Sequence, residues 1–271
     1  MTSKRPFSAK NFLNFRQIRE PYMRKCLILI LGSMSILPVL GQSSAPKYSN
    51  EFLSIGISAR ALGMSNTVVA SVNDVTGGYW NPAALTLIES DIQLGVMHSE
   101  YFAGIAKYDY GSFAMALPEK NAAVGLSIIR FGVDDIPNTL YLVEADGSIN
   151  YDNITAFSVA DYAFLGSYAQ QLKWHNLRVG GNIKVVLREA GECATAWGFG
   201  LDAGAQMDLN NWKFGATFKD ITSTFNAWSF SFTEEEKQVL LATGNIIPEN
   251  SLEITTPKLI LGAAYDFTLN E

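Results

Sequence analysis

The chain has 271 residues, of which 48% are hydrophobic and 17% charged, and this composition is compatible with a soluble globular protein or a membrane barrel. Charge is unevenly distributed: residues 1–41 hold seven of the 20 basic residues and one of the 26 acidic residues, which leaves 13 basic against 25 acidic residues, a net charge of −12, in the remainder. Nucleic-acid binding needs clustered Lys and Arg side chains, so this acidic chain excludes that class of function.

The first 41 residues have the layout of a secretory signal peptide. A basic stretch precedes an apolar run, residues 26–40, and small and polar residues follow from Gly41. A membrane-spanning helix is the alternative, but these 15 residues are interrupted by Gly, Ser and Pro and fall short of the roughly 20 that span a bilayer. We therefore expect export and cleavage after Gly41, with residues 1–22 as an N-terminal extension of the signal.

Few residues in the exported part could bind a metal or form a disulfide. Cys26 leaves with the signal peptide, so Cys193 remains without a partner in the same chain. Two His and one Cys argue against a tetrahedral zinc site, and the acidic residues Asp134 and Asp135 lack the regular ligand spacing of a calcium loop. We expect no metal and no other cofactor.

Residues 42–88 form a separate N-terminal element, because apolar and polar residues do not alternate there as they do further on. Within it, the pattern predicts a glycine-punctuated helical stretch at residues 59–72 and a turn-rich run at residues 74–82.

Residues 89–271 are dominated by an alternation of apolar residues with polar or small ones, which predicts β-strands. In residues 177–188, for example, Ile183 lies on an apolar face, whereas Asn182 and Lys184 lie on a polar face. One face suits lipid and the other suits water. The predicted strands are 91–99, 105–117, 121–132, 154–172, 177–189, 194–209, 212–220 and 258–269.

The lengths of the connections distinguish a membrane barrel from a soluble sandwich, which also alternates. Bacterial barrels join strands of about 9–11 residues by short turns at one end and long loops at the other. Here the second, fourth and sixth connections are short, and the two longest, residues 133–153 and 221–257, both fall at the other end. The sequence therefore predicts an all-β fold, a transmembrane antiparallel β-barrel of the cell outer membrane.

The longest loop, residues 221–257, has features that oppose plain disorder. Thr233 and Glu236 form a capping-box pattern, which predicts a short helix over about 234–242. Exposed aromatic residues often anchor interfaces, so we expect a partner-binding cluster, with a self-packed lid over the barrel mouth as the alternative. Its residues are Phe225, Trp228, Phe230 and Phe232.

Aromatic residues near the predicted strand ends suit the interfacial girdles of a membrane barrel. Filling of the core is the alternative for each of them. They are Tyr101, Phe102, Trp174, Trp197, Trp212 and Trp228.

The arrangement that most suggests catalysis is His98-Ser99-Glu100. On a strand, His98 and Glu100 share a face while Ser99 points away, so the base cannot reach the hydroxyl, and we expect no enzyme. Inward-facing charges predict a solvated polar lumen, with a transport site as the alternative. These charges are Arg178, Lys184, Arg188, Asp202 and Asp208.

Several motifs point to a known family. The N-terminal element contains Phe52-Leu53-Ser54-Ile55-Gly56, Ala59-Arg60-Ala61-Leu62-Gly63-Met64 and Tyr79-Trp80-Asn81-Pro82-Ala83-Ala84-Leu85, and residues 130–139 and 225–230 add two loop motifs. From about residue 50 onward the chain resembles the PorV/PorQ family, in its PorV-like branch, among the FadL-like outer-membrane barrels of the Bacteroidota. The motif residues to which the resemblance gives a structural role are Arg60, Gly63, Asp74, Tyr79, Trp80, Asn81 and Pro82.

The resemblance implies a barrel of about 14 strands whose N-terminal element packs in the lumen. Only about eight strands are predicted here, so we expect a C-terminally truncated member of the family, and a closed eight-stranded barrel is the alternative.

The function that the resemblance implies is type IX protein secretion, in which the barrel binds exported proteins with a C-terminal sorting domain and passes them to the surface attachment machinery. Its partners would be secretion-system proteins, exported cargo and outer-membrane lipid. The alternatives are FadL-like passage of small hydrophobic molecules and a purely structural surface subunit. Long polar loops favour a protein partner, whereas a continuous apolar lumen pocket would favour a lipid-like ligand.

Overall fold

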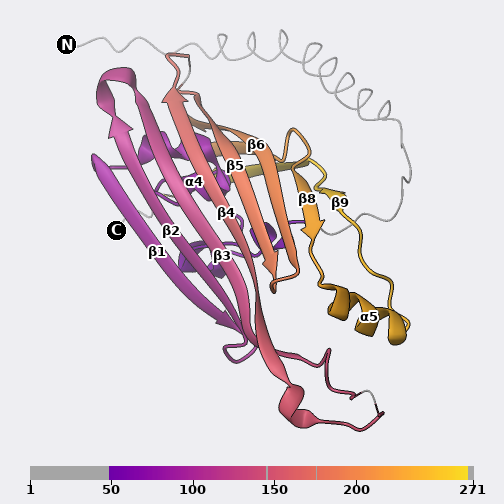
Figure 1. Cartoon of the computed structure of the whole chain (residues 1–271). Helices are drawn as coiled ribbons and strands as arrows, with labels where there is room; N and C mark the ends of the chain where they lie inside the picture. The colour runs from indigo at the N-terminus through magenta and orange to yellow at the C-terminus, as the bar shows by residue number, and fades with distance from the viewer. Residues whose placement is uncertain (1–48, 145, 175, 268–271) are drawn as a thin grey trace, which may run out of the picture. The chain divides into compact units, whose positions relative to one another are not determined.

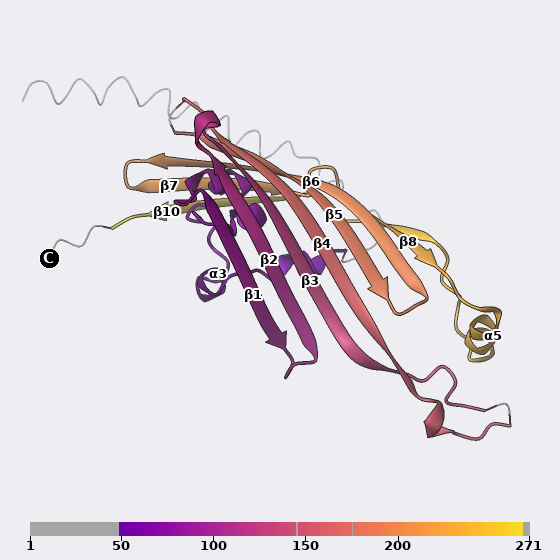
Figure 2. The same ribbon diagram turned by 60° about the vertical axis from the view of Figure 1, so that its left-hand side comes forward.

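The computed structural model of the chain describes residues 49–144, 146–174 and 176–267 (Figure 1). The predicted signal peptide and the last two residues of the predicted final strand lie outside this part of the chain. The predicted all-β, antiparallel, barrel-type fold is confirmed in the form of a half-barrel. The described sheet curls around a lumen and is open, with β1 and β10 as its two edges, so a closed eight-stranded barrel is not what these residues form (Figure 2).

Eight strands follow one another across the sheet, and each pairs antiparallel with the next. The predicted bounds agree within two residues for most of them. The strands are β1 (Ile92–Tyr101), β2 (Ala106–Leu117), β3 (Ala122–Asn138), β4 (Thr155–Gln171), β5 (Arg178–Ala190), β6 (Ala194–Leu209), β7 (Trp212–Lys219) and β10 (Lys258–Tyr265). A 3-10 turn, η4 (Pro118–Lys120), joins β2 to β3.

Two of these strands, β7 and β10, are each extended by a second, shorter strand beyond a break in the chain. The extension of β7 is β8 (Phe225–Phe230), and the extension of β10 is β9 (Ser251–Ile254). β8 pairs with the first part of β6, while β7 pairs with its second part. β9 pairs with β8, as β10 pairs with β7. The prediction of one loop over 221–257 is therefore wrong at both ends, and the true excursion is residues 231–250. It contains α5 (Glu234–Ala242), whose predicted capping box between Thr233 and Glu236 is confirmed.

β3 also runs further than predicted. It passes through a register shift between Val133 and Ile136, where Asp135 has a left-handed φ of 57°, and continues to Asn138. Such a bulge interrupts the side-chain alternation without ending the strand. The loop predicted from residue 133 therefore began too early. The excursion between β3 and β4 is residues 139–154 and includes η5 (Tyr151–Asn153).

The N-terminal element, residues 49–88, lies on the concave face of the sheet, between β1 and the β7–β10 pair (Figure 2). It consists of η2 (Glu51–Ser54), α3 (Ala59–Gly63), α4 (Gly77–Trp80) and η3 (Pro82–Leu87). The predicted helix over 59–72 is wrong beyond Gly63, because Ser65 and Asn66 have left-handed φ values of 53° and 63° and end it.

Apolar side chains of this element and of the concave face form two core clusters, the larger of which has the following members. The element contributes Phe52, Ile57, Ala61, Val68, Val72, Tyr79, Trp80 and Ala84, and the sheet contributes Tyr108, Tyr110, Ile129, Ala163, Leu165 and Val186. Hydrogen bonds fix the element on the sheet: Asn182 donates to Gly78 O (2.8 Å), Thr217 to Trp80 O (3.0 Å) and Gln206 to Ala70 O (2.8 Å). The concave face is thus largely filled by protein.

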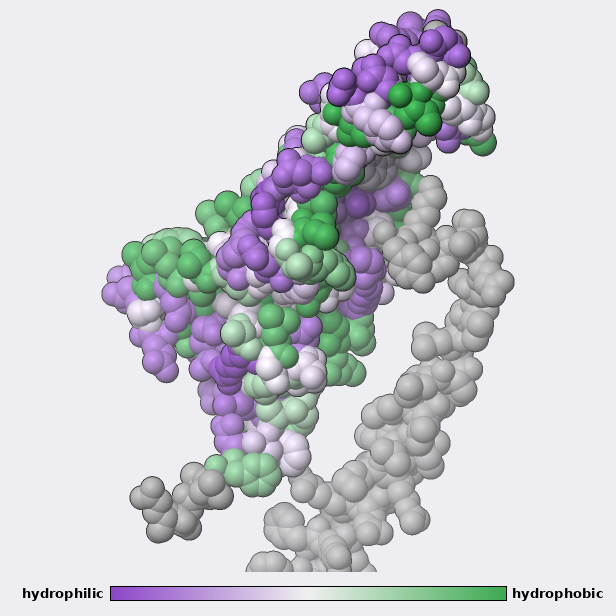
Figure 3. All heavy atoms as spheres, turned by 90° about the horizontal axis from the view of Figure 1, so that it is seen from below, coloured by the Kyte–Doolittle hydropathy of each residue, from purple (hydrophilic) through white to green (hydrophobic). Residues whose placement is uncertain are grey.

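The convex face is apolar across neighbouring strands. The outward residues Val96, Leu261 and Ile183 have exposed fractions of 91%, 72% and 58%. Viewed from the end where the two excursions lie, hydrophilic residues gather over the excursions and hydrophobic residues lie on the flanks of the sheet (Figure 3). No helix in the described ranges is both long and apolar enough to span a membrane.

Candidate functional site

The motif residues of the N-terminal element hold that element together and anchor it to the sheet. The Tyr79 hydroxyl donates to Leu53 O (2.7 Å) and accepts from Gly56 N (3.1 Å), and Trp80 Nε1 donates to Ile57 O (3.2 Å).

The Asn81 side chain both holds the N-terminal element together and anchors it to the sheet. Its Nδ2 donates to Val69 O (2.9 Å) within the element and to Ala205 O (3.0 Å) on β6, and its Oδ1 accepts from Ala83 N (3.2 Å). Pro82 begins η3 beside it. These hydrogen bonds engage both polar atoms of the Asn81 side chain.

The remaining motif residues lie apart from this group. Arg60 is exposed and donates to Asn73 Oδ1 (3.3 Å), and Gly63 is exposed at the end of α3. Asp74 accepts from the backbone nitrogen of Thr76 (2.9 Å) and so starts the turn ahead of α4.

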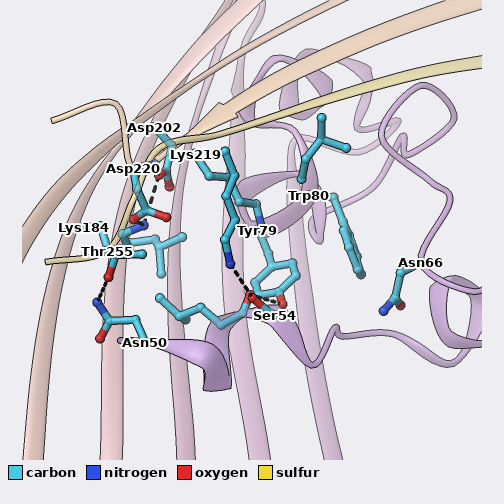
Figure 4. A pocket seen from close by; sticks show the side chains of 14 residues that line it. Asn50, Ser54, Asn66, Tyr79, Trp80, Lys184, Asp202, Lys219, Asp220 and Thr255 are labelled. Atoms are coloured by element: carbon cyan, nitrogen blue, oxygen red, sulfur yellow. Dashed lines mark hydrogen bonds and ion pairs between the residues drawn. The ribbon is translucent and has the colours of Figure 1, made fainter. Parts of the chain in front are cut away.

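A cavity of about 210 Å³ lies between the N-terminal element and β5–β7 (Figure 4). Lys184 Nζ lies 3.1 Å from Asp202 Oδ1 and 2.5 Å from Asp220 Oδ1, with all three side chains buried. The backbone nitrogen of Asp220 also donates to Asp202 Oδ1 (2.9 Å). Lys184 therefore neutralises one of two buried carboxylates.

Two further lysines line this cavity. Lys219 Nζ lies 4.3 Å from the centroid of the Tyr79 ring and 5.7 Å from that of Trp80, a cation–π arrangement. Lys258 Nζ lies 3.3 Å from Glu51 Oε1. Three lysines and two carboxylates line the cavity together with apolar side chains such as Leu165 and Ile260. The cavity is smaller than the roughly 300–1,000 Å³ usual for small-molecule sites.

The other predicted inward charges are on the concave face and paired. Arg188 Nε contacts Asp161 Oδ1 (2.7 Å) and its Nη1 contacts Glu253 Oε2 (3.3 Å), while Arg178 Nη2 contacts Asp208 Oδ2 (2.7 Å). Sequence reasoning missed Lys219, Asp220 and Lys258, which line the cavity with Lys184 and Asp202. The adjacent Lys219-Asp220 pair at a predicted strand end was the available signal.

The His98 cluster lies on the convex face. His98 Nδ1 contacts Asp109 Oδ1 (2.6 Å) and Nε2 contacts Glu100 Oε1 (3.6 Å), so the ring is held by carboxylates. Among the described residues, no group of three or more His, Cys, Asp or Glu is placed to hold a metal ion.

The residues of the predicted aromatic cluster lie on opposite faces of the sheet. Phe225 points to the convex face, where 43% of it is exposed, while Trp228 and Phe230 point to the other face of β8. Trp228, Phe230 and Phe232 stack in a row, with centroid distances of 5.9 and 6.4 Å. The Arg188 guanidinium lies 5.1 Å from the centroid of the Trp228 ring. Only Phe232 lies in the excursion itself.

The two excursions meet at one end of the sheet and enclose a cleft of about 670 Å³, here named the excursion cleft. Leu140 of the β3–β4 excursion, Glu192 of the β5–β6 turn and Leu240 of α5 line it. Loss of hydration and the nearby Glu235 and Glu236 carboxylates raise the pKa of the Tyr141 phenol in the same excursion as Leu140.

Charge concentrates at this end. Residues 139–154, 191–193 and 231–250 contain eight acidic residues and one lysine. Sequence reasoning missed the cleft because its walls come from three separate segments, although the absence of Lys and Arg from 139–154 was a signal.

Comparisons with known proteins add no assignment to this geometry: no protein-family model, no curated protein and no solved structure matches the chain. The resemblance to the PorV/PorQ family therefore stays an expectation from the sequence. The site with the features of a binding surface is the excursion cleft, since the concave face is filled and its cavity is small.

Proposed function

We propose that this protein is an outer-membrane β-barrel component of type IX protein secretion, of the PorV/PorQ family, and that it binds exported proteins through its excursions. The observation that carries the proposal is the division of the half-barrel into an apolar convex face, a concave face filled by its own N-terminal element, and one end built from long acidic excursions.

The convex face supports a membrane location. Soluble proteins rarely expose contiguous apolar surface of this extent. The outward charged residues of β1–β3 lie toward the excursion end and pair with one another, as in the contacts of Asp109 with His98 (2.6 Å) and with Arg130 (3.3 Å). An apolar band bounded by polar residues is the surface of a transmembrane barrel.

Aromatic residues at the opposite end support the same location. Trp212 contacts Tyr265 (centroids 4.9 Å apart) and stacks on Phe214 (6.1 Å), and Tyr265 contacts Phe267 (4.6 Å). Barrels carry such aromatic girdles where the apolar band meets the lipid headgroups. Of the other predicted girdle residues, Phe102, Trp174 and Trp197 are exposed, whereas Tyr101 packs toward the core.

The lumen supports protein handling over passage of hydrophobic molecules. A hydrophobic substrate needs a continuous apolar path. Here the N-terminal element occupies the concave face, and the cavity beside it has Lys184, Asp202, Lys219 and Asp220 among its lining residues, which interrupt its apolar surface. The largest space formed by the excursions is three times that volume, at about 670 Å³ against about 210 Å³.

The test removes the β8–β9 excursion without touching the strands. A deletion that began at residue 225 would remove β8, which pairs with both β6 and β9, and would confuse folding with function. Replacing residues 232–249 by an Asn-Gly turn keeps both strands. A matched insertion in the β2–β3 turn, residues 118–121, alters the opposite end instead.

In cells of the native host, the excursion variant should insert into the outer membrane but lose copurifying secretion proteins and surface delivery of cargo. The variant with the altered β2–β3 turn should retain both. If cargo delivery survives in the excursion variant, the proposal fails, and lost uptake of a small hydrophobic molecule in that variant would identify a transporter.

A further inference from the structure

The excursion cleft contains a free strand edge. β5 pairs with β4 only from Val159 onward, so residues 155–158 of β4 have no neighbouring strand on that side within the described chain. Ser158 O accepts from Gly191 N (3.0 Å), which shows that the backbone groups of Ser158 point to this side.

The same reasoning places the backbone groups of Ala156 in the cleft. In an antiparallel strand the N–H and C=O of one residue point to one side, and alternate residues point to the same side, so Ala156 follows Ser158. Its partner on β3 is Pro137, which has no N–H to exchange. Thr155, Ala156, Phe157 and Ser158 all line the cleft. A free edge of this kind accepts a strand from another protein.

The walls of the cleft specify which kind of strand fits. Leu140, Phe232 and Leu240 provide apolar surface, and Glu192 and Glu236 provide negative charge. The end of α5 and the residues after it leave apolar side chains in solvent, with Leu241 60% and Ile246 90% exposed. An occupant that alternates apolar with basic side chains would satisfy both surfaces, because successive side chains of a strand face opposite ways.

We propose that the excursion cleft binds an extended segment of a protein partner that carries Lys or Arg side chains, and that this segment adds a strand to β4 at residues 155–158. This rests on the proposed function, since it names the chemistry by which the excursions recognise a protein. Backbone pairing supplies affinity for an extended chain, and the acidic walls select a basic one.

The experiment measures binding of fluorescent peptides of about ten residues to the full chain in detergent. One peptide alternates valine with lysine and the other alternates valine with glutamate. Ala156→Pro removes the N–H that points into the cleft without breaking a bond to β3, and Ala156→Val is the matched control that keeps the N–H. Glu192→Gln with Glu236→Gln removes two charges, and Gln retains the capping box of α5.

The lysine peptide should bind, and the glutamate peptide should bind at least about tenfold more weakly. Ala156→Pro should lower affinity for the lysine peptide about tenfold, whereas Ala156→Val should change it less than about twofold. The double Gln variant should lose several-fold in affinity and much of its sensitivity to salt.

Equal binding of the lysine peptide to the Ala156→Pro and Ala156→Val variants would overturn strand addition, and equal binding of both peptides would overturn selection by charge. If neither peptide binds while the variant without residues 232–249 still loses cargo delivery, this inference fails and the proposed function stands. If that variant delivers cargo normally, the proposed function fails whatever the peptides do.

Discussion

Gly180 of β5 lies directly against Pro82 of the N-terminal element. A Cβ at Gly180 would come 2.6 Å from the carbonyl carbon of Pro82 and 2.6 Å from the backbone nitrogen of Ala83, distances that require one backbone to move. The absence of a side chain at this position therefore allows the element to rest on the sheet.

The Gly180→Ala variant should lower the free energy of unfolding by about 1–3 kcal/mol, the usual cost of overpacking a close contact. Gly166→Ala is the matched control, because nothing lies within 4 Å of a Cβ there, and it should cost much less. Urea unfolding of both variants in detergent checks this. Equal stability of the two would mean that the N-terminal element does not pack on β5 as described.

A second prediction concerns the buried charges beside the cavity. Lys184→Ala leaves the Asp202 and Asp220 carboxylates buried without their shared cation, and loss of one partner in such a group costs about 3–5 kcal/mol. The exposed pair Lys213–Asp266 (2.8 Å) provides the control, since Lys213→Ala should cost about 0–1 kcal/mol. A similar loss in both variants, measured by the same unfolding assay, would contradict the buried ion cluster.

Most of the sheet could be predicted because alternation is a local property. The predicted strand 194–209 matches β6 at both ends, and the Thr233–Glu236 capping box fixes the start of α5. β8 was missed because Asp220 and Ser223 have left-handed φ values of 56° and 57°, which turn the chain and break the phase of the pattern just before it.

The face of the sheet on which each charged residue lies could also be predicted, but its ion-pair partner could not. Lys184 was placed on the concave face, whereas its contact Asp220 lies 36 residues away, at a distance that no local period encodes. The polar face of β5 was expected to contact water. Asn182 is instead 4% exposed, because the N-terminal element covers it and Gly78 O accepts its hydrogen bond (2.8 Å).

The third prediction tests the proposed lipid-facing surface. Ile183 is central on β5 and points outward, so Ile183→Arg should cost about 2–4 kcal/mol if it lies near the bilayer midplane. Asn182 cannot serve as a tolerant control because it is buried. Thr195→Arg can, since Thr195 points outward at the excursion end of β6 and should cost about 0–1 kcal/mol. A membrane-insertion assay that tolerates Arg equally at both positions would exclude the proposed membrane band.

The last prediction concerns pH and the β3–β4 excursion. Glu144 accepts hydrogen bonds from Asn150 Nδ2 (2.8 Å) and Asn153 Nδ2 (3.3 Å), which tie the excursion together across its own turn. These bonds, first from Asn150 and then from Asn153, hold the pKa of the Glu144 carboxyl below its ordinary value of 4.5. Because the folded pKa is lowered, the stabilisation is present above the ordinary pKa and is lost as the pH falls through the lowered one.

Backbone hydrogen exchange in residues 139–154, corrected for the intrinsic effect of pH, should therefore quicken as the pH falls from neutrality to about 3. Glu144→Gln removes the titrating carboxyl at this position, so the corrected exchange rate of residues 139–154 should depend much less on pH in this variant. Some pH dependence should remain from Asp146, because hydrogen bonds from Ser148 lower the pKa of its carboxyl. An identical pH dependence in the Glu144→Gln variant would show that another group orders the excursion, and the wall of the cleft would then not depend on this carboxylate.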